Sequence, residues 1–190
     1  IIKKVKASGF KTVRIPITWI NCMDTSTNTV RADFMARVKE VVDWCIEEDL
    51  YVISNVHHDG GSADTAWIRN AAKDFTGVEK RFASLWTQIS QTFKDYSDYL
   101  VFEGMNEIDF GSVSKNEAYD TMNKLNQTFV DTVRSTGGNN AQRHLLVSGY
   151  NTDIALTSDS RFVMPQDKAG RLMLSLHYYS PPQFCVAESN

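Results

Sequence analysis

Short apolar runs alternate along this chain with longer stretches whose apolar residues recur every three or four positions. The short runs predict five strands, at residues 11–17, 50–56, 100–105, 145–148 and 172–176. The helical spacing predicts helices between them, at about 33–48, after about residue 76 with an apolar stripe over 82–93, and at 116–135. Strands this apolar are typical of a parallel sheet that helices cover, so we expect repeated strand–helix units.

Two architectures fit this alternation, an open doubly wound sheet and a (β/α)8 barrel. Five units suit the open sheet in number, but no Gly-x-Gly-x-x-Gly motif follows the first predicted strand. Polar residues instead follow the carboxyl ends of successive strands, where barrel enzymes carry their chemistry. We therefore expect part of a TIM barrel, forming one domain over residues 1–190. Residues 3–9 resemble the last turns of a helix and residues 187–190 an open loop, so we expect this domain to be truncated at both ends.

The composition argues against several classes of partner. The net charge is −3 and no basic run is present, which argues against nucleic-acid binding. No apolar stretch in the sequence approaches the roughly 18 residues of a membrane span. The three cysteines show no zinc-binding spacing, and Cys45 falls on the apolar face of a predicted helix, so we expect it in the core.

The dipeptide Asn106-Glu107 directly follows a predicted strand and is the main candidate for catalysis. A carboxyl group here is either a surface side chain or a general acid that partial burial keeps protonated. Glu103 lies inside the same strand, and we expect it to be structural. Arg14 lies within the first predicted strand, where a buried guanidinium must be paired. Its partner is either an active-site carboxylate or Glu103.

Histidine and tryptophan residues follow other predicted strands. His57 and His58 come after the second strand, and His177 follows the fifth. Together they allow a metal site, but no further His or Cys is placed to complete one. For His57 we instead expect hydrogen bonding to substrate or to a catalytic carboxylate. Trp19 and Trp67 are each either core residues or platforms on which a sugar ring stacks.

Four motifs carry a family resemblance. They span residues 13–19 (VRIPITW), 55–59 (NVHHD), 102–107 (FEGMNE) and 177–181 (HYYSP). Together they resemble glycoside hydrolase family 5, above all its endoglucanases active on cellulose, lichenan and xyloglucan. The resemblance implies a (β/α)8 barrel in which the five strands are numbers two to six. It also implies a β-1,4-glucan polysaccharide as substrate, no metal or organic cofactor, and a secreted enzyme.

The resemblance implies a retaining mechanism with two carboxylates. Glu107 would be the general acid/base, Asn106 would bind the 2-hydroxyl of the sugar, and Arg14 would support the carboxylate of the nucleophile. The nucleophile is expected beyond Asn190, because Glu188 follows the fifth predicted strand too closely.

Further residues would complete the implied site. His57 and His177 would line the subsite of the cleaved bond, and Tyr179 would lie near the nucleophile. His58 would contact substrate, and Trp19 would support the site or bind substrate.

Three alternatives stay open on the sequence. A related barrel enzyme that cuts mannan or another β-glycan would share these motifs. A fragment that binds glycan without cleaving it, or that needs the rest of the barrel as a partner, would leave two sheet edges exposed. A metal-dependent hydrolase would use His57, His58 and His177.

Overall fold

The structure is a computed structural model that describes residues 1–61 and 65–186. Its main feature is a five-stranded parallel sheet in the order β1-β4-β5-β6-β7. These strands are β1 (Thr12–Ile15), β4 (Tyr51–Asn55), β5 (Leu100–Glu103), β6 (Leu145–Asp153) and β7 (Leu172–His177). The five predicted strands are therefore confirmed, and they lie side by side in chain order.

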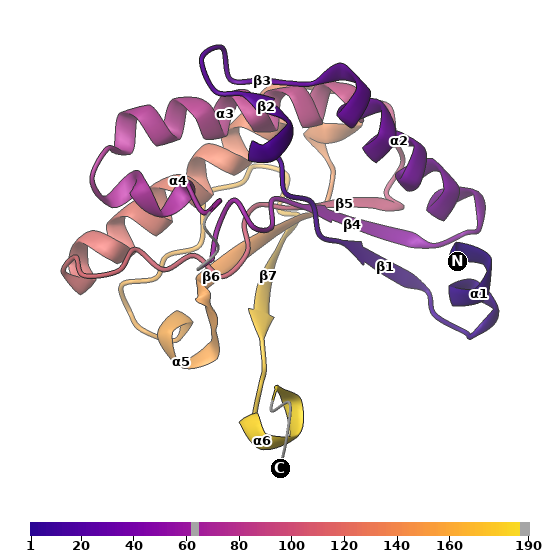
Figure 1. Cartoon of the computed structure of the whole chain (residues 1–190). Coiled ribbons are helices and arrows are strands. Elements are labelled where there is room, and N and C mark those ends of the chain that lie inside the picture. The colour runs from indigo at the N-terminus through magenta and orange to yellow at the C-terminus, as the bar shows by residue number, and fades with distance from the viewer. Residues whose placement is uncertain (62–64, 187–190) are drawn as a thin grey trace.

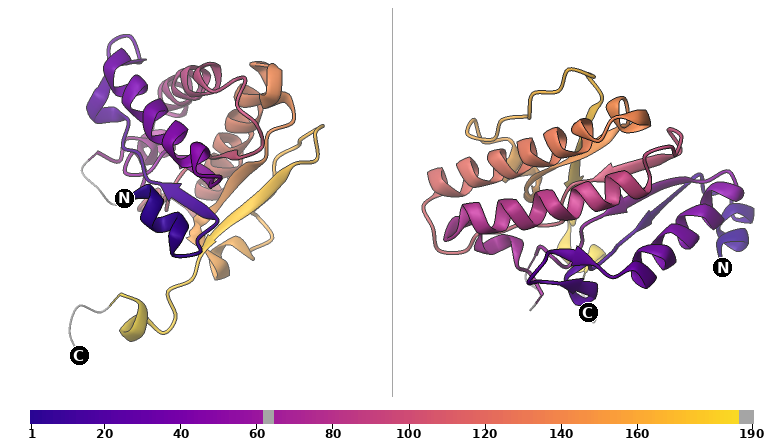
Figure 2. Two further views of the ribbon diagram at one scale, coloured as in Figure 1. Left: turned by 90° about the vertical axis from the view of Figure 1, so that its right-hand side faces the viewer. Right: turned by 90° about the horizontal axis from the view of Figure 1, so that it is seen from above.

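The long helices lie on one side of this sheet. They are α2 (Ala32–Glu47), α3 (Phe75–Thr92) and α4 (Lys115–Ser135), and all three cover the same face (Figure 1). In the two further views, the three long helices again lie together on one side of the strands (Figure 2). A doubly wound sheet carries helices on both faces, so the one-sided arrangement favours the barrel architecture.

The apolar stripes of the helices and the sheet form one core. The ring of Trp86 on α3 lies 5.5 Å from that of Phe102 on β5 and 4.5 Å from that of Phe129 on α4, measured between centroids. Cys45 on α2 is buried, as predicted. The aromatic contacts fix β5, the strand that leads into Asn106-Glu107.

Two regions differ from the sequence-based expectation. The polar residues after β1 predict a loop, but they form a hairpin of β2 (Met23–Asp24) and β3 (Thr29–Val30). Gln88 of α3 holds this hairpin, because it accepts from the Val30 N–H and donates to the Asn28 carbonyl. The apolar pattern of β6 predicts an end at Ser148, whereas the strand continues to Asp153 through a register shift against β7.

The remaining elements are short helices: α1 (Ile2–Ala7), η1 (Ile20–Cys22), η2 (Ile68–Ala72), η3 (Gly138–Ala141), α5 (Ile154–Thr157) and α6 (Pro182–Cys185). Within residues 1–61 and 65–186, every helix is too short or too polar to cross a membrane.

Arg143 closes the amino-terminal end of the sheet, just before β6. Its buried guanidinium donates five hydrogen bonds, one from each N–H group. The acceptors are Asn140 Oδ1 and the carbonyls of Phe93, Tyr96, Ser97 and Leu100. Burial lowers the pKa of Arg143 to about 10, so the side chain stays charged at neutral pH. It ties the end of α3 to the start of β5.

The two outer strands of the sheet each have one unpaired edge in the described part of the chain. β1 pairs only with β4, and β7 pairs only with β6. Apolar side chains on β7 also stay exposed, including Met173 at 39% and Leu176 at 40%. The five strands therefore form an open arc.

Candidate active site

A partly buried ion pair joins the carboxyl ends of β1, β5 and β7. Arg14 Nε donates to Glu103 Oε2 at 2.6 Å, and Arg14 Nη2 donates to Asn106 Oδ1 at 2.8 Å. Ser175 Oγ donates to the other oxygen of Glu103, also at 2.6 Å. Glu103 is buried, whereas 32% of the Arg14 side chain is exposed. Of the two partners expected for Arg14, the structure contains Glu103, and Arg14 in turn orients the amide of Asn106.

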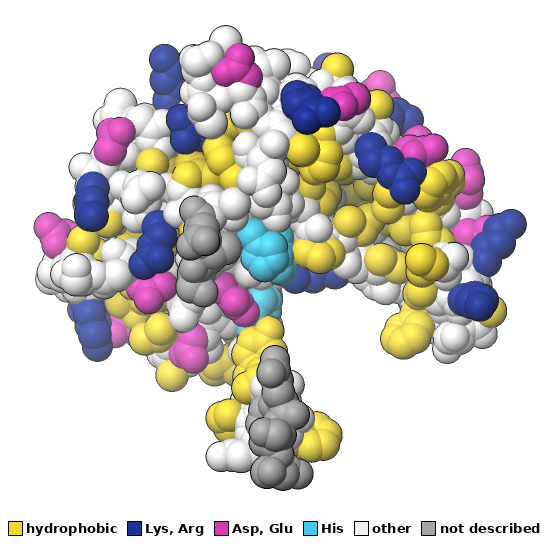
Figure 3. Space-filling view, in the orientation of Figure 1, with side chains coloured by type: hydrophobic (Ala, Val, Ile, Leu, Met, Phe, Trp, Pro, Cys, Tyr) yellow, Lys and Arg dark blue, Asp and Glu magenta, His cyan; other side chains and the backbone are white. Residues whose placement is uncertain are grey.

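Glu107 follows this ion pair along the chain and faces β7. Its Oε1 lies 2.7 Å from His177 Nδ1 and 3.5 Å from the Tyr179 hydroxyl, and 38% of its side chain is exposed. An ionised carboxylate only accepts hydrogen bonds, so His177 then carries a proton on Nδ1. Figure 3 shows histidine side chains beside acidic ones at the centre of this face. The fold thus brings together Glu107, His177 and Tyr179.

Glu107 lines a cavity of about 380 Å³. The other lining residues come from the carboxyl ends of β6 and β7 and the segment after β7: Asn151, Thr152, Asp153, His177, Tyr179 and Ser180. Such a cavity offers a carboxylate, a phenol, an imidazole and an amide over a short distance. This combination suits a ligand that carries many hydroxyl groups.

His57 follows β4, and its ring is neutral near pH 7. Burial, together with the positive charge of Arg14, lowers the pKa of His57 to about 4. Asn55 Nδ2 lies 3.0 Å from His57 Nδ1, while Asn55 Oδ1 accepts from the Ile17 N–H. The amide nitrogen is therefore the donor, and His57 Nδ1 accepts. The proton of the neutral ring must lie on Nε2, where it is available to a ligand.

Asp59 joins the loops that follow β1 and β4. Its buried carboxylate accepts from the Trp19 N–H at 2.7 Å, the Ile20 N–H at 2.9 Å and the Trp67 indole N–H at 2.7 Å. Burial raises the pKa of Asp59, although these three donors act against the rise.

Trp19 and Trp67 belong to the core. Trp19 is fully buried, and its indole N–H donates to the Asn55 carbonyl at 3.0 Å. Trp67 is 7% exposed. The sugar-stacking alternative is therefore wrong for both residues, because neither presents a ring face to solvent. Trp19 contacts Asp59 through its backbone N–H and Asn55 through its indole, and its expected role in supporting the site stays a prediction.

His58 is exposed, and its ring meets that of His57 edge-on with 4.6 Å between centroids. Among the residues that the structure describes, no group of three or more His, Cys, Asp or Glu side chains is placed to hold a metal ion. The metal-site alternative built on His57, His58 and His177 has no support in that part of the chain.

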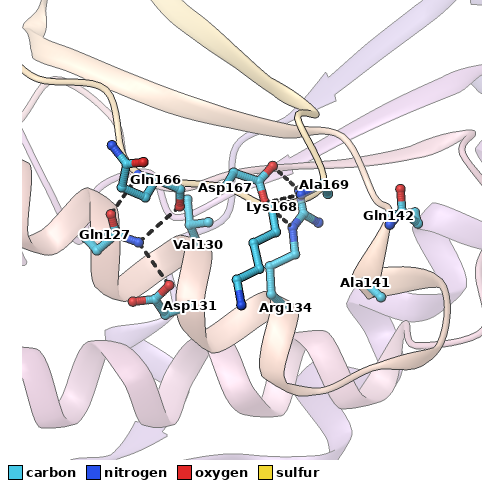
Figure 4. Close-up of a pocket in the computed structure, with 10 residues that line it drawn as sticks. All are labelled: Gln127, Val130, Asp131, Arg134, Ala141, Gln142, Gln166, Asp167, Lys168 and Ala169. Carbon is cyan, nitrogen blue, oxygen red and sulfur yellow. Dashed lines mark hydrogen bonds and ion pairs between the residues drawn. The ribbon is translucent and has the colours of Figure 1, made fainter.

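A larger cavity, of about 600 Å³, lies between α4 and the segment that precedes β7 (Figure 4). Arg134 crosses it and donates to both carboxylate oxygens of Asp167, at 2.9 and 3.0 Å. This contact lowers the pKa of Asp167 to about 2. Arg134 also donates to the carbonyls of Asn140 and Arg143, before β6 begins. The cavity therefore lies at the amino-terminal end of the sheet, away from Glu107, and its ion pair holds a loop in place.

The sequence patterns did not predict three parts of the site. Asp59 was visible only as an acidic residue after two histidines. Ser175 is the single polar residue in the apolar run 172–176, which is a usable signal for an inward contact. Residues 151–153 gave no signal, because the apolar pattern ends before them.

Comparisons with known proteins agree with this geometry. The sequence model of the cellulase family (glycosyl hydrolase family 5) matches residues 1–189. Endoglucanase A of Paenibacillus barcinonensis is 40% identical, over 100% of this chain and 51% of that protein. The structure of a broad-specificity endoglucanase from an uncultured bovine rumen ciliate is 48% identical with a TM-score of 0.88, over 100% of this chain and 51% of that one. A family 5 xyloglucanase from Paenibacillus pabuli is 40% identical with a TM-score of 0.93, over 99% and 56%.

The chain spans about half the length of these relatives. Its five parallel strands, with helices on one side, form part of a TIM barrel. The family match covers almost every residue, and the fold agrees with solved structures of the same family. The chain therefore belongs to the cellulase family, glycoside hydrolase family 5.

Proposed function

We propose that this chain carries the acid/base half of a retaining endo-β-1,4-glucanase. The observation that carries the proposal is the position of Glu107. Its carboxyl group lies just past a buried strand, contacts His177 and Tyr179, and lines a polar cavity. The family membership and the printed names of the relatives, endoglucanase and xyloglucanase, support a β-glucan as substrate.

In this mechanism Glu107 acts twice. It first protonates the glycosidic oxygen while a second carboxylate attacks the anomeric carbon, so that the leaving sugar departs and a glycosyl-enzyme forms. Glu107 then removes a proton from water, which hydrolyses that intermediate. Arg14 orients Asn106 so that its amide binds the 2-hydroxyl of the cleaved sugar. His57 donates a hydrogen bond from Nε2 to the substrate.

The second carboxylate is proposed to come from outside the described residues. Glu103 is engaged with Arg14 and Ser175, and Asp153 Oδ1 accepts from the Leu156 N–H at the start of α5. Glu188 lies outside the described residues. In a retaining enzyme the two carboxyl groups lie ~5–5.5 Å apart. The rest of the barrel would also cover the open edges of β1 and β7.

Two parts of the proposal stay predictions. The preference among β-glucans depends on loops around the whole barrel, and a related enzyme that cuts mannan would use the same residues. The secreted location implied by the resemblance is likewise a prediction. Hydrolysis of glucomannan without hydrolysis of β-glucan would favour the mannanase alternative.

The test of the proposal is Glu107→Gln in the complete catalytic domain, assayed for reducing sugar released from soluble β-glucan. We expect the loss of one general acid/base to lower kcat by about 10²–10⁴-fold. The matched control is Asp109→Asn, an exposed carboxylate two residues further on that caps a turn at Gly111. It should leave turnover nearly unchanged.

A second readout separates a lost acid/base from a misfolded variant. With a nitrophenyl β-cellobioside, whose leaving group departs without protonation, and azide as external nucleophile, Glu107→Ala should form a glycosyl azide of retained β configuration, because azide needs no deprotonation to attack the intermediate. An azide product of inverted configuration would exclude the retaining mechanism. Near-normal turnover of Glu107→Gln would exclude Glu107 as the acid/base.

A further inference from the structure

Strained backbone collects around the Glu107 cavity. Five non-glycine residues in the described part of the chain have left-handed φ angles, and three of them line this cavity: Glu107 at 47°, Asn151 at 50° and Thr152 at 49°. A β-branched residue such as Thr152 rarely adopts this conformation. Backbone strain of this kind persists only where the surrounding structure enforces it, and it concentrates at ligand-binding sites.

The left-handed residues Asn151 and Thr152 lie within the register shift of β6. The shift lies between Ser148 and Asp153, at the end of the strand nearest the cavity. Bulges at the rim of a barrel redirect a side chain beside an active site. The Asn151 N–H donates to the Ile108 carbonyl at 3.1 Å, which ties the shifted segment to the residue after Glu107. The shift thus fixes Asn151 relative to the catalytic loop.

The side chain of Asn151 forms no hydrogen bond within the described residues 1–61 and 65–186. In the described part of the chain, only its backbone atoms form hydrogen bonds: the N–H donates to Ile108, and the carbonyl accepts from Thr152 Oγ1. Its neighbour Asp153 differs, because its carboxylate already caps α5 through the Leu156 N–H. The Asn151 amide therefore offers a donor pair and an acceptor to a ligand in the cavity.

The contacts of Asn106 and Glu107 indicate which sugar this ligand is. Asn106 is held on the β1 side by Arg14, and Glu107 contacts His177 and Tyr179 on the β7 side. In the proposed mechanism Asn106 binds the sugar whose anomeric carbon is attacked. The sugar that leaves with the protonated oxygen must then lie on the other flank of Glu107, over the end of β6.

We propose that the Asn151 amide hydrogen-bonds a hydroxyl group of the leaving sugar, and so helps to determine how strongly the enzyme prefers a glycan over a simple leaving group. This inference rests on the proposed function. The shifted end of β6 is then a specificity element, because its strain places an unused amide beside the general acid.

The experiment compares two substrates in the complete catalytic domain. One is a cello-oligosaccharide, whose leaving group is a sugar, and the other is a nitrophenyl β-cellobioside, whose leaving group has no hydroxyl groups to bind. For Asn151→Gly we expect kcat/KM on the oligosaccharide, divided by kcat/KM on the nitrophenyl cellobioside, to fall about tenfold. The loss of one hydrogen bond to the leaving sugar predicts a change of this size. Glycine tolerates a φ of 50°, so the variant should fold at least as well as the wild type.

Asn28→Gly is the matched control. Asn28 is also left-handed, at a φ of 56°, but it lies in the β2–β3 hairpin, where Arg81 binds its side chain. The ratio should not move in this control. An Asn151→Gly variant that loses activity equally on both substrates, or loses none, would overturn the inference while leaving the proposed function intact. A wild-type enzyme that cleaves neither substrate would refute the proposed function, and the inference with it.

Discussion

Arg143 and Arg14 lie at opposite ends of the same sheet, and the protein uses them in opposite ways. Arg143 is buried, and each of its five N–H groups donates to a protein acceptor. Arg14 donates through Nε and Nη2 to Glu103 and Asn106, while about a third of its side chain stays exposed, 32% by area.

The same contrast extends to the neighbours of the two arginines. At the amino-terminal end, the Asp167 carboxylate is fully engaged by Arg134. At the carboxyl-terminal end, Glu107 is partly exposed, His57 has a proton on Nε2, and the Asn151 amide has no internal partner among the described residues. Polar groups that are all satisfied stabilise a fold, whereas groups with remaining hydrogen-bonding capacity can bind a ligand.

The largest effect on stability should come from Arg143→Met. The substitution removes five charge-assisted hydrogen bonds, among them those to Asn140 Oδ1 and to the carbonyls of buried Phe93 and Leu100, so the free energy of unfolding should fall by about 3–5 kcal/mol. Urea denaturation of the complete domain measures it. The kcat of the folded enzyme should hold, because Arg143 lies far from Glu107 along β5. Arg143→Lys, which keeps the charge and three donors, should recover part of the loss. If Arg143→Met lowered the free energy of unfolding by less than about 1 kcal/mol, the amino-terminal end of the sheet would not be the stabilising end that the contrast requires.

The second effect concerns His57 and pH. Its folded-state pKa of about 4 lies below the ordinary value of 6.5, so the unfolded chain binds the proton first as the pH falls. Stability contributed by the neutral ring is present above pH 6.5 and is lost between pH 6.5 and 4. The loss should be about 1–3 kcal/mol, because the ring is only partly buried.

Unfolding measured at several pH values tests this expectation. His57→Gln should show a flatter decline in stability than the wild type over the same interval. His144→Gln, at the amino-terminal end of the sheet, should keep the wild-type decline. Identical slopes in the wild type and His57→Gln would show that His57 does not fold in its neutral form.

The smallest effect should come from Gly60→Ala. A Cβ at this position would lie 2.2 Å from Ile108 Cδ1 and 2.6 Å from the Asn106 carbonyl oxygen, so the loop that carries Asn106 and Glu107 would have to move. We expect kcat/KM on β-glucan to fall about tenfold, because small displacements of a catalytic group are costly. Adding Ile108→Val removes the nearer atom and should restore part of the activity. Full activity in Gly60→Ala alone would show that the loop tolerates displacement.

Local patterns predicted the strands and the long helices because each depends on the spacing of apolar residues. They also placed Glu107, Asn106 and His177 at strand ends, since the end of an apolar run is visible in the sequence. The structure confirms these positions, while the catalytic roles stay predictions. Whether Arg14 faced Glu103 or another carboxylate could not be read from the sequence, because their separation is 89 residues.

Other features depended on contacts that spacing does not encode. An aromatic residue after a strand has the same sequence signature whether it stacks on sugar or fills the core. The burial of Trp19 and its contact with the Asn55 carbonyl, which place it in the core, appear only in the structure. Two of the three partners of Asp59, the N–H groups of Trp19 and Ile20, lie in the preceding loop at sequence separations of 40 and 39. The shift in β6 follows the point where the apolar pattern stops, so Asn151 had no periodicity to reveal it.

The contact between Asp59 and the Trp67 indole gives this loop pair a spectroscopic reporter. An indole N–H that donates to a buried carboxylate at 2.7 Å is deshielded and protected from exchange. In a nitrogen-15 correlation spectrum its resonance should stand apart from that of the exposed Trp44. Movement of the loops that follow β1 and β4 could therefore be followed through one native signal, without any added label.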